Sequence, residues 1–142
     1  MFTDAQAVHD YAMAGRAVLT LSSEKTGARY TYRVAQARDK ETGEPEAKWF
    51  VSLLSGPENT SDYTYMGMLD AVGFRVTKAS KFAADSTPVR AFNYFWKHVA
   101  AGQMAPQVEV RHEGHCGRCG RTLTVPESID SGIGPECAKK MG

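Results

Sequence analysis

The sequence predicts an α+β fold in which an antiparallel meander sheet is covered by an amphipathic helix. Two patterns predict this core. Five runs of alternating or β-rich residues come first, and a run whose apolar side chains recur at helical spacing follows them. A third observation concerns the C-terminus, where cysteines and histidines are spaced like metal ligands. This spacing predicts a C-terminal zinc knuckle, or ribbon, with a short helix.

The length and composition are those of one packed core with a small addition. The chain has 142 residues, of which 42% are hydrophobic and 10% aromatic. These values exclude a disordered protein. We expect an α+β core domain over residues 1–104 and a zinc-binding unit over residues 105–142, because Gly102 and Pro106 bracket a break between them.

The first elements are a helix and five strands. Thr3 with Gln6 three residues later has the spacing of a capping box, and Gly15 can end the helix. Ser23–Gly27 is typical of a hairpin loop. The predicted strands are Ala17–Ser22, Arg29–Ala37, Lys48–Leu54, Tyr63–Leu69 and Phe74–Thr77.

The covering helix has the clearest pattern in the chain. Thr87 is placed to cap it, Pro88 suits its first turn, and Gly102 ends the run. Its apolar stripe predicts packing on the sheet; the stripe consists of Val89, Phe92, Phe95, Trp96 and Val99. A short strand at Gln107–Arg111 then leads into the segment that carries the cysteines.

Charge and targeting signals exclude several classes of protein. The formal net charge is +1, from 17 basic and 16 acidic residues, which argues against a broadly basic nucleic-acid coat. The segment 75–106 is locally basic, with five lysines and arginines against Asp85 alone (5 − 1 = +4). No signal peptide and no apolar run of about 20 residues occurs, so we expect a cytoplasmic protein with no membrane contact.

The metal site is predicted from spacing. His112-x3-Cys116-x2-Cys119-x17-Cys137 provides four ligands for tetrahedral zinc. An odd count of three cysteines excludes full disulfide pairing and favours metal binding in a reducing compartment. His115 is the alternative fourth ligand, but it adjoins Cys116 and would have to converge on the same ion. No open coordination position with a general base is evident, so we expect a structural zinc and no enzyme.

Basic residues beside these ligands suggest a nucleic-acid contact. Arg118, Arg121, Lys139 and Lys140 flank the cysteines. The segment Ser128–Met141 is similar to a helix-hairpin-helix loop, in which backbone N–H groups bind a phosphate. The favoured alternative is that Gly132 and Gly134 only shape the chain so that Cys137 reaches the metal.

Tyrosines and arginines alternate on the predicted sheet. Tyr30 and Tyr32 share one face and Arg29 and Arg33 the other, and the pair Tyr63 and Tyr65 repeats the spacing of two residues. Exposed aromatic rings beside basic side chains can stack on the bases of a single strand. Packing of these tyrosines beneath the covering helix is the favoured alternative.

The region from His112 to Met141 resembles a family of uncharacterised proteins of bacteriophages and actinobacteria. The match lies in H-x-G-x-C-G-R-C-G-R-x-L-T-x-P-x-S-I-x-x-G-I-G-P-x-C, which this chain satisfies throughout. Upstream, the segments Thr26–Tyr32, Leu54–Asn59 and Asp62–Gly67 are similar to longer members of that family. The resemblance implies a small zinc-bearing accessory protein encoded by a phage, and it implies no activity.

Two functions remain open at this point. One is a nucleic-acid-binding accessory protein that uses the zinc unit and the basic residues beside it. The other is a protein-binding module that inhibits or redirects a host enzyme, such as a defence nuclease. The second fits the near-neutral charge and the lack of a catalytic constellation. The partner is therefore expected to be a nucleic acid or a host protein.

Overall fold

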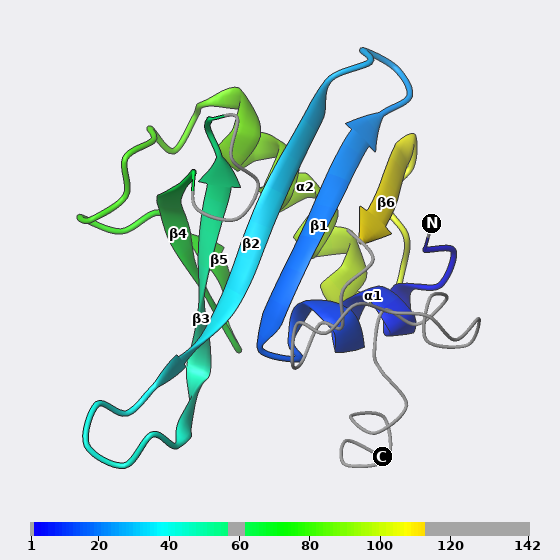
Figure 1. Cartoon of the computed structure of the whole chain (residues 1–142). Helices are drawn as coiled ribbons and strands as arrows, with labels where there is room; N and C mark the ends of the chain where they lie inside the picture. Colours follow the sequence, from blue (N-terminus) through cyan, green and yellow to red (C-terminus); the bar gives the residue numbers. More distant parts are fainter. Residues whose placement is uncertain (1, 57–61, 113–142) are drawn as a thin grey trace.

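A computed structural model describes residues 2–56 and 62–112. The strands of this part form one antiparallel sheet in the order β5-β4-β3-β2-β1-β6 (Figure 1). The elements along the chain are α1 (Ala5–Ala12), β1 (Arg16–Ser23), β2 (Arg29–Arg38), β3 (Pro45–Leu54), β4 (Tyr63–Asp70), β5 (Gly73–Arg75), α2 (Thr87–Ala100) and β6 (Val108–His112).

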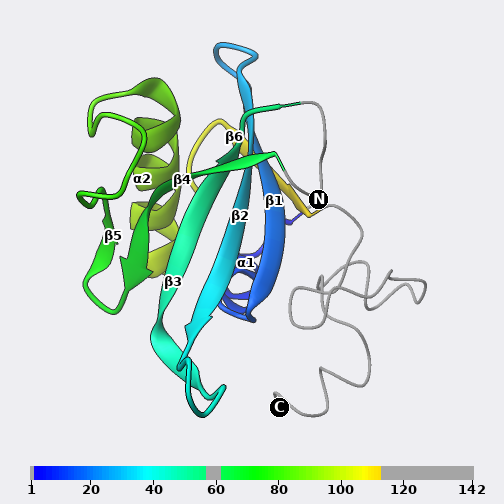
Figure 2. The ribbon, with the colours of Figure 1, turned by 60° about the vertical axis from the view of Figure 1, so that its left-hand side comes forward.

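The sheet curls around the two helices, which lie on the same side of it (Figure 2). Alternate residues of each strand point to this side and are buried, as Leu19, Val34 and Val51 show. From α2, Phe92 and Phe95 are fully buried against them. The core therefore fills the space between the curled sheet and the helices.

Tyr32 of β2 ties the sheet to the start of α2. Its ring lies edge-on to Phe92, with 5.1 Å between the ring centroids, and its hydroxyl donates a 2.8 Å hydrogen bond to the carbonyl oxygen of Pro88. Burial, with a smaller contribution from Tyr30, raises the pKa of the Tyr32 hydroxyl far above its ordinary value. The favoured packing role of this tyrosine is confirmed.

The N-terminal residues close the core beside β6. The Asp4 carboxylate caps α1 by accepting a hydrogen bond from the backbone N–H of Ala7, so the cap is one residue later than the predicted Thr3. Phe2 forms an isolated bridge with Val110 of β6, and its ring packs on Tyr11 of α1. Phe2 thus joins α1 to β6.

The predicted fold class is wrong. The sequence predicted a five-stranded meander covered by one amphipathic helix, with a zinc knuckle beside it. The described residues instead form a six-stranded, half-barrel-like sheet, and the N-terminal helix packs on the same side of it as α2. Within residues 2–56 and 62–112, no group of three metal-binding side chains occurs. The five predicted strands are all present with shifted ends, and β6 is added next to β1, where Leu21 pairs with Val110.

The strand β6 was predicted as a connection to the zinc-binding unit, but its pairing partner was not. Pairing of β6 with β1 joins segments that are more than 80 residues apart in the sequence, and no local pattern predicts such a contact. The division of the chain after residue 104 stays a prediction, although Val108–His112 belongs to the core sheet.

Candidate functional site

His112 is the one predicted zinc ligand that the structure describes. It is the last residue of β6 and pairs with Leu19 of β1. Its half-buried ring packs against Phe2 and Tyr11, at centroid distances of 5.6 and 5.7 Å. Because Val110, two residues earlier, is buried in the core, His112 lies on the helix side of the sheet. The ring is therefore held in place by the core at the point where the described chain ends.

The other predicted site residues lie outside the described residues. They are the metal ligands Cys116, Cys119 and Cys137, the alternative ligand His115, and the basic residues Arg118, Arg121, Lys139 and Lys140. The metal site and the basic patch around it therefore stay predictions. His112 fixes the position in the core from which that segment starts.

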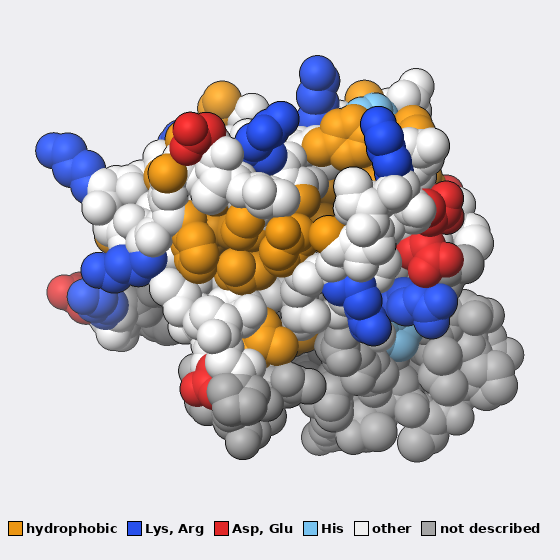
Figure 3. Space-filling model, turned by 90° about the horizontal axis from the view of Figure 1, so that it is seen from above, with side chains coloured by type: hydrophobic (Ala, Val, Ile, Leu, Met, Phe, Trp, Pro, Cys, Tyr) orange, Lys and Arg blue, Asp and Glu red, His pale blue; other side chains and the backbone are white. Residues whose placement is uncertain are grey.

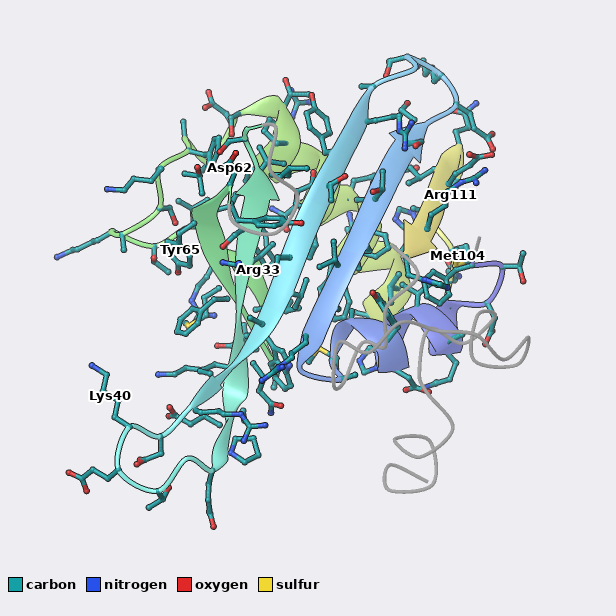
Figure 4. All side chains as sticks on the ribbon, in the orientation of Figure 1. Arg33, Lys40, Asp62, Tyr65, Met104 and Arg111 are labelled. Atoms are coloured by element: carbon teal, nitrogen blue, oxygen red, sulfur yellow. The ribbon has the colours of Figure 1, made fainter. Side chains whose placement is uncertain are left out.

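A second candidate site is the outer face, by which we mean the side of the sheet opposite the helices. The alternation of the paired strands assigns its residues. They are Arg16, Val18, Thr20 and Ser22 of β1, Arg29, Thr31, Arg33 and Ala35 of β2, Lys48, Phe50 and Ser52 of β3, Tyr63, Tyr65, Met68 and Asp70 of β4, Arg75 of β5, and Glu109 and Arg111 of β6. Figure 4 looks onto this face and labels Arg33, Tyr65 and Arg111.

Aromatic rings and an arginine meet on the outer face. The guanidinium of Arg33 lies over the ring of Tyr63, 4.7 Å from its centroid. Beside them, Phe50 and Tyr65 pack edge to face with 5.9 Å between centroids. Phe50 is 40% exposed, which is unusual for a phenylalanine in the middle of a strand. The face therefore offers flat apolar and cationic groups together.

Some arginines of the outer face form ion pairs, whereas others form none with the residues that the structure describes. Arg75 donates a 2.8 Å hydrogen bond to Asp70, which holds the pKa of that carboxyl below its usual value. The Nη2 atom of Arg111 lies 3.6 Å from the Oε2 atom of Glu109. Within the described part of the chain, Arg16, Arg29 and Arg33 form no ion pair with an acidic side chain. This leaves three arginines whose charge no described carboxylate neutralises.

The structure separates the two tyrosine pairs that the sequence grouped together. Tyr32 is fully buried beneath α2, whereas Tyr63 and Tyr65 lie on the outer face with Arg33. A register shift between β3 and β4 at Val51 and Ser52 contributes to this difference. Sequence reasoning missed Phe50, because the apolar run around it does not reveal which residue points outward.

Comparison with known proteins relates the last part of the chain to a protein family. Residues 107–142 match the model of a family of unknown function (DUF6011). The matched segment begins just before β6 and covers 36 of the 142 residues (142 − 107 + 1 = 36). No curated protein and no solved structure matches the chain. No described helix is long and apolar enough to cross a membrane. The C-terminal segment, with its cysteines, is thus similar to a family that has no assigned activity.

Proposed function

We propose that this protein is a small zinc-binding accessory protein that binds single-stranded nucleic acid. The outer face of the sheet contacts the strand, and Arg118, Arg121, Lys139 and Lys140 add phosphate contacts from the segment that follows β6. Zinc, held by His112, Cys116, Cys119 and Cys137, stabilises that segment. Arg111 of the outer face directly precedes His112, so the β6 edge of this face is close in the chain to that segment.

The observation that carries the proposal is the combination, on the outer face, of aromatic rings with arginines that form no ion pair among residues 2–56 and 62–112. Bases stack on tyrosine and phenylalanine rings and on guanidinium planes, and each stacked base contributes about 1–3 kcal/mol to binding. Phe50, Tyr65 and the Arg33–Tyr63 pair supply such surfaces. Arg16 and Arg29, exposed at either end of the face, suit the phosphates between the bases.

The position of His112 supports its role as a zinc ligand. A ligand ring is most effective when its orientation is fixed before the metal binds. Phe2 and Tyr11 pack on this imidazole, and β6 fixes its backbone. Four residues of chain span at most about 14 Å, so Cys116 is within reach of the same ion. The zinc would supply folding free energy to the C-terminal segment and take no part in a reaction.

The test is binding of a fluorescent single-stranded oligonucleotide, measured by anisotropy with the full zinc-loaded chain. The triple variant Arg16→Gln, Arg29→Gln, Arg33→Gln should bind about tenfold or more weakly, because three cationic contacts with the strand are lost. A control variant, Lys40→Gln, Lys81→Gln, Lys97→Gln, removes the same charge from exposed positions away from the outer face. Its affinity should stay close to that of the parent protein.

Two results would contradict the proposal. Equal loss of affinity in both triple variants would show that net charge, and not the outer face, decides binding. No binding of the parent protein at low salt would exclude nucleic acid and favour the protein-binding module. In that case, a host protein captured on the parent but not on a Phe50→Ala, Tyr65→Ala variant would identify the outer face as a protein interface.

A further inference from the structure

A cavity of about 670 Å³ lies between α2 and the β1–β2 hairpin loop, on the side of the sheet opposite the outer face. This volume is in the range of small-molecule sites. Figure 3 views this end of the molecule and shows apolar side chains gathered at its centre, with charged side chains around them. Leu21, Ala28, Ala91 and Val108 form the apolar part of the lining.

The polar lining of the cavity is cationic. Lys25 from the hairpin loop and Arg90 from α2 are its charged residues, and no acidic side chain is among the described residues that line it. Neither Lys25 nor Arg90 forms an ion pair within the described part of the chain. The cavity therefore favours an anion, and the two cations reach it from opposite walls.

Two tyrosines give the cavity flat walls. Tyr30 contributes from β2 and Tyr94 from α2. Tyr94 is 43% exposed, and its hydroxyl donates a 3.3 Å hydrogen bond to the carbonyl oxygen of Pro106, which holds the ring at the rim. Aromatic side chains of this kind bind the faces of planar rings.

The lining also contains Gln107, the one described non-glycine residue with a positive φ angle. Gln107 has φ of 62°, in the left-handed region, which costs about 1–2 kcal/mol for a residue with a side chain. Its carbonyl oxygen accepts a 2.8 Å hydrogen bond from the N–H of Glu24, so it joins the hairpin loop to the start of β6. Strained residues of this kind occur where surrounding structure holds a binding site in shape.

We infer that this cavity binds a nucleotide unit, with its phosphate between Lys25 and Arg90 and its base against Tyr30 and Tyr94. Two ligands carry such a unit, namely a free mononucleotide and the phosphorylated end of a strand. The inference does not rest on strand binding at the outer face, because the two sites lie on opposite sides of the sheet.

The test uses the full zinc-loaded chain and a fluorescent adenosine monophosphate. The parent protein should bind it with a Kd below about 1 mM. Arg90→Gln and Lys25→Gln should each weaken binding about fivefold or more, because each removes one charge-assisted contact. The control Lys97→Gln, which removes a charge from α2 outside the lining, should leave the Kd unchanged. Competition by adenosine monophosphate should exceed competition by adenosine or by inorganic phosphate.

Further binding measurements distinguish a free mononucleotide from a strand end, and the cavity from the outer face. An oligonucleotide with a 5′ phosphate that binds more tightly than the same strand without it, in an Arg90-dependent way, would identify a strand end as the ligand. Equal binding of the two strands would leave the free nucleotide as the ligand. The inference fails if the mononucleotide does not bind, if phosphate alone competes equally well, or if Arg33→Gln weakens mononucleotide binding and Arg90→Gln does not.

Discussion

The hydroxyl of Tyr11 forms two hydrogen bonds with the backbone of Val18. It donates to the carbonyl oxygen at 2.8 Å and accepts from the N–H at 3.1 Å. Val18 lies directly beyond the last β1–β6 pair, which joins Leu19 to His112. The tyrosine of α1 thus binds the backbone of β1 just beyond its described pairing with β6, and its ring packs on His112 at the same time.

Tyr11→Phe should therefore destabilise the core without changing its packing. Two backbone groups of Val18 lose their partner, and an unsatisfied buried group costs about 1–3 kcal/mol. The loss should appear as a lower midpoint in urea unfolding, with an unchanged slope. An unchanged midpoint would show that water or another group replaces the hydroxyl without cost.

Gly67 of β4 is required by the short strand β5. A Cβ atom at this position would lie 2.6 Å from the carbonyl oxygen of Arg75 and 2.7 Å from the ring of Phe74. Gly67→Ala should cost about 1–3 kcal/mol, because either the ring or the backbone of β5 has to move. Urea unfolding measures this, with Ala35→Gly on β2 as a control that changes one methyl group without a clash. A Gly67→Ala variant as stable as the parent would contradict the close approach of β5.

Much of the core follows from local patterns in the sequence. The stripe of α2 is buried as predicted, with Val89, Phe92 and Phe95 at 0–1% exposure. The hairpin loop Ser23–Gly27 is present, and Gly27 adopts the positive φ of 76° that favours glycine there. These features depend on residues that are neighbours along the chain.

The remaining features depend on contacts between distant residues. The pairing of β6 with β1 and the bridge from Phe2 to Val110 are long-range contacts, so no local sequence pattern predicts them. The meeting of Arg33 with Tyr63 also needs the strand order and the register shift in β3–β4. For the candidate site, the sequence identified His112 as a candidate ligand but not its aromatic surroundings.

Zinc content is the first prediction for the C-terminal segment. The purified chain should contain about one zinc ion, because four ligands at these spacings match a tetrahedral site. Cys137→Ser should lose the metal and increase proteolysis after residue 112, since metal binding there is largely folding free energy. Elemental analysis and limited proteolysis measure both. A chain prepared without chelator that contains no zinc would remove the basis of the metal site.

The fourth ligand is tested by substitutions that separate metal binding from packing. His112→Phe keeps a ring against Phe2 and Tyr11 but removes the nitrogen donor, so it should release zinc to a chelator faster at nearly unchanged core stability. His115→Ala should retain the metal as the parent does. If His115→Ala releases zinc and His112→Phe does not, then His115 is the ligand.

The salt dependence of strand binding tests the central claim most directly. Anisotropy of a single-stranded oligonucleotide, titrated with the full chain between about 50 and 200 mM salt, gives the slope of log affinity against log salt. The three arginines of the outer face contribute about −2 to this slope, at about −0.7 for each contact with a single strand, and the four basic residues that follow β6 make the slope of the parent protein steeper. The Lys139→Gln, Lys140→Gln variant, shown first to retain zinc, should bind more weakly with a flatter slope. We predict measurable binding with a steep slope, and a flatter slope both in this variant and in the Arg16→Gln, Arg29→Gln, Arg33→Gln variant. No binding at low salt, or binding that does not depend on salt, would contradict the account.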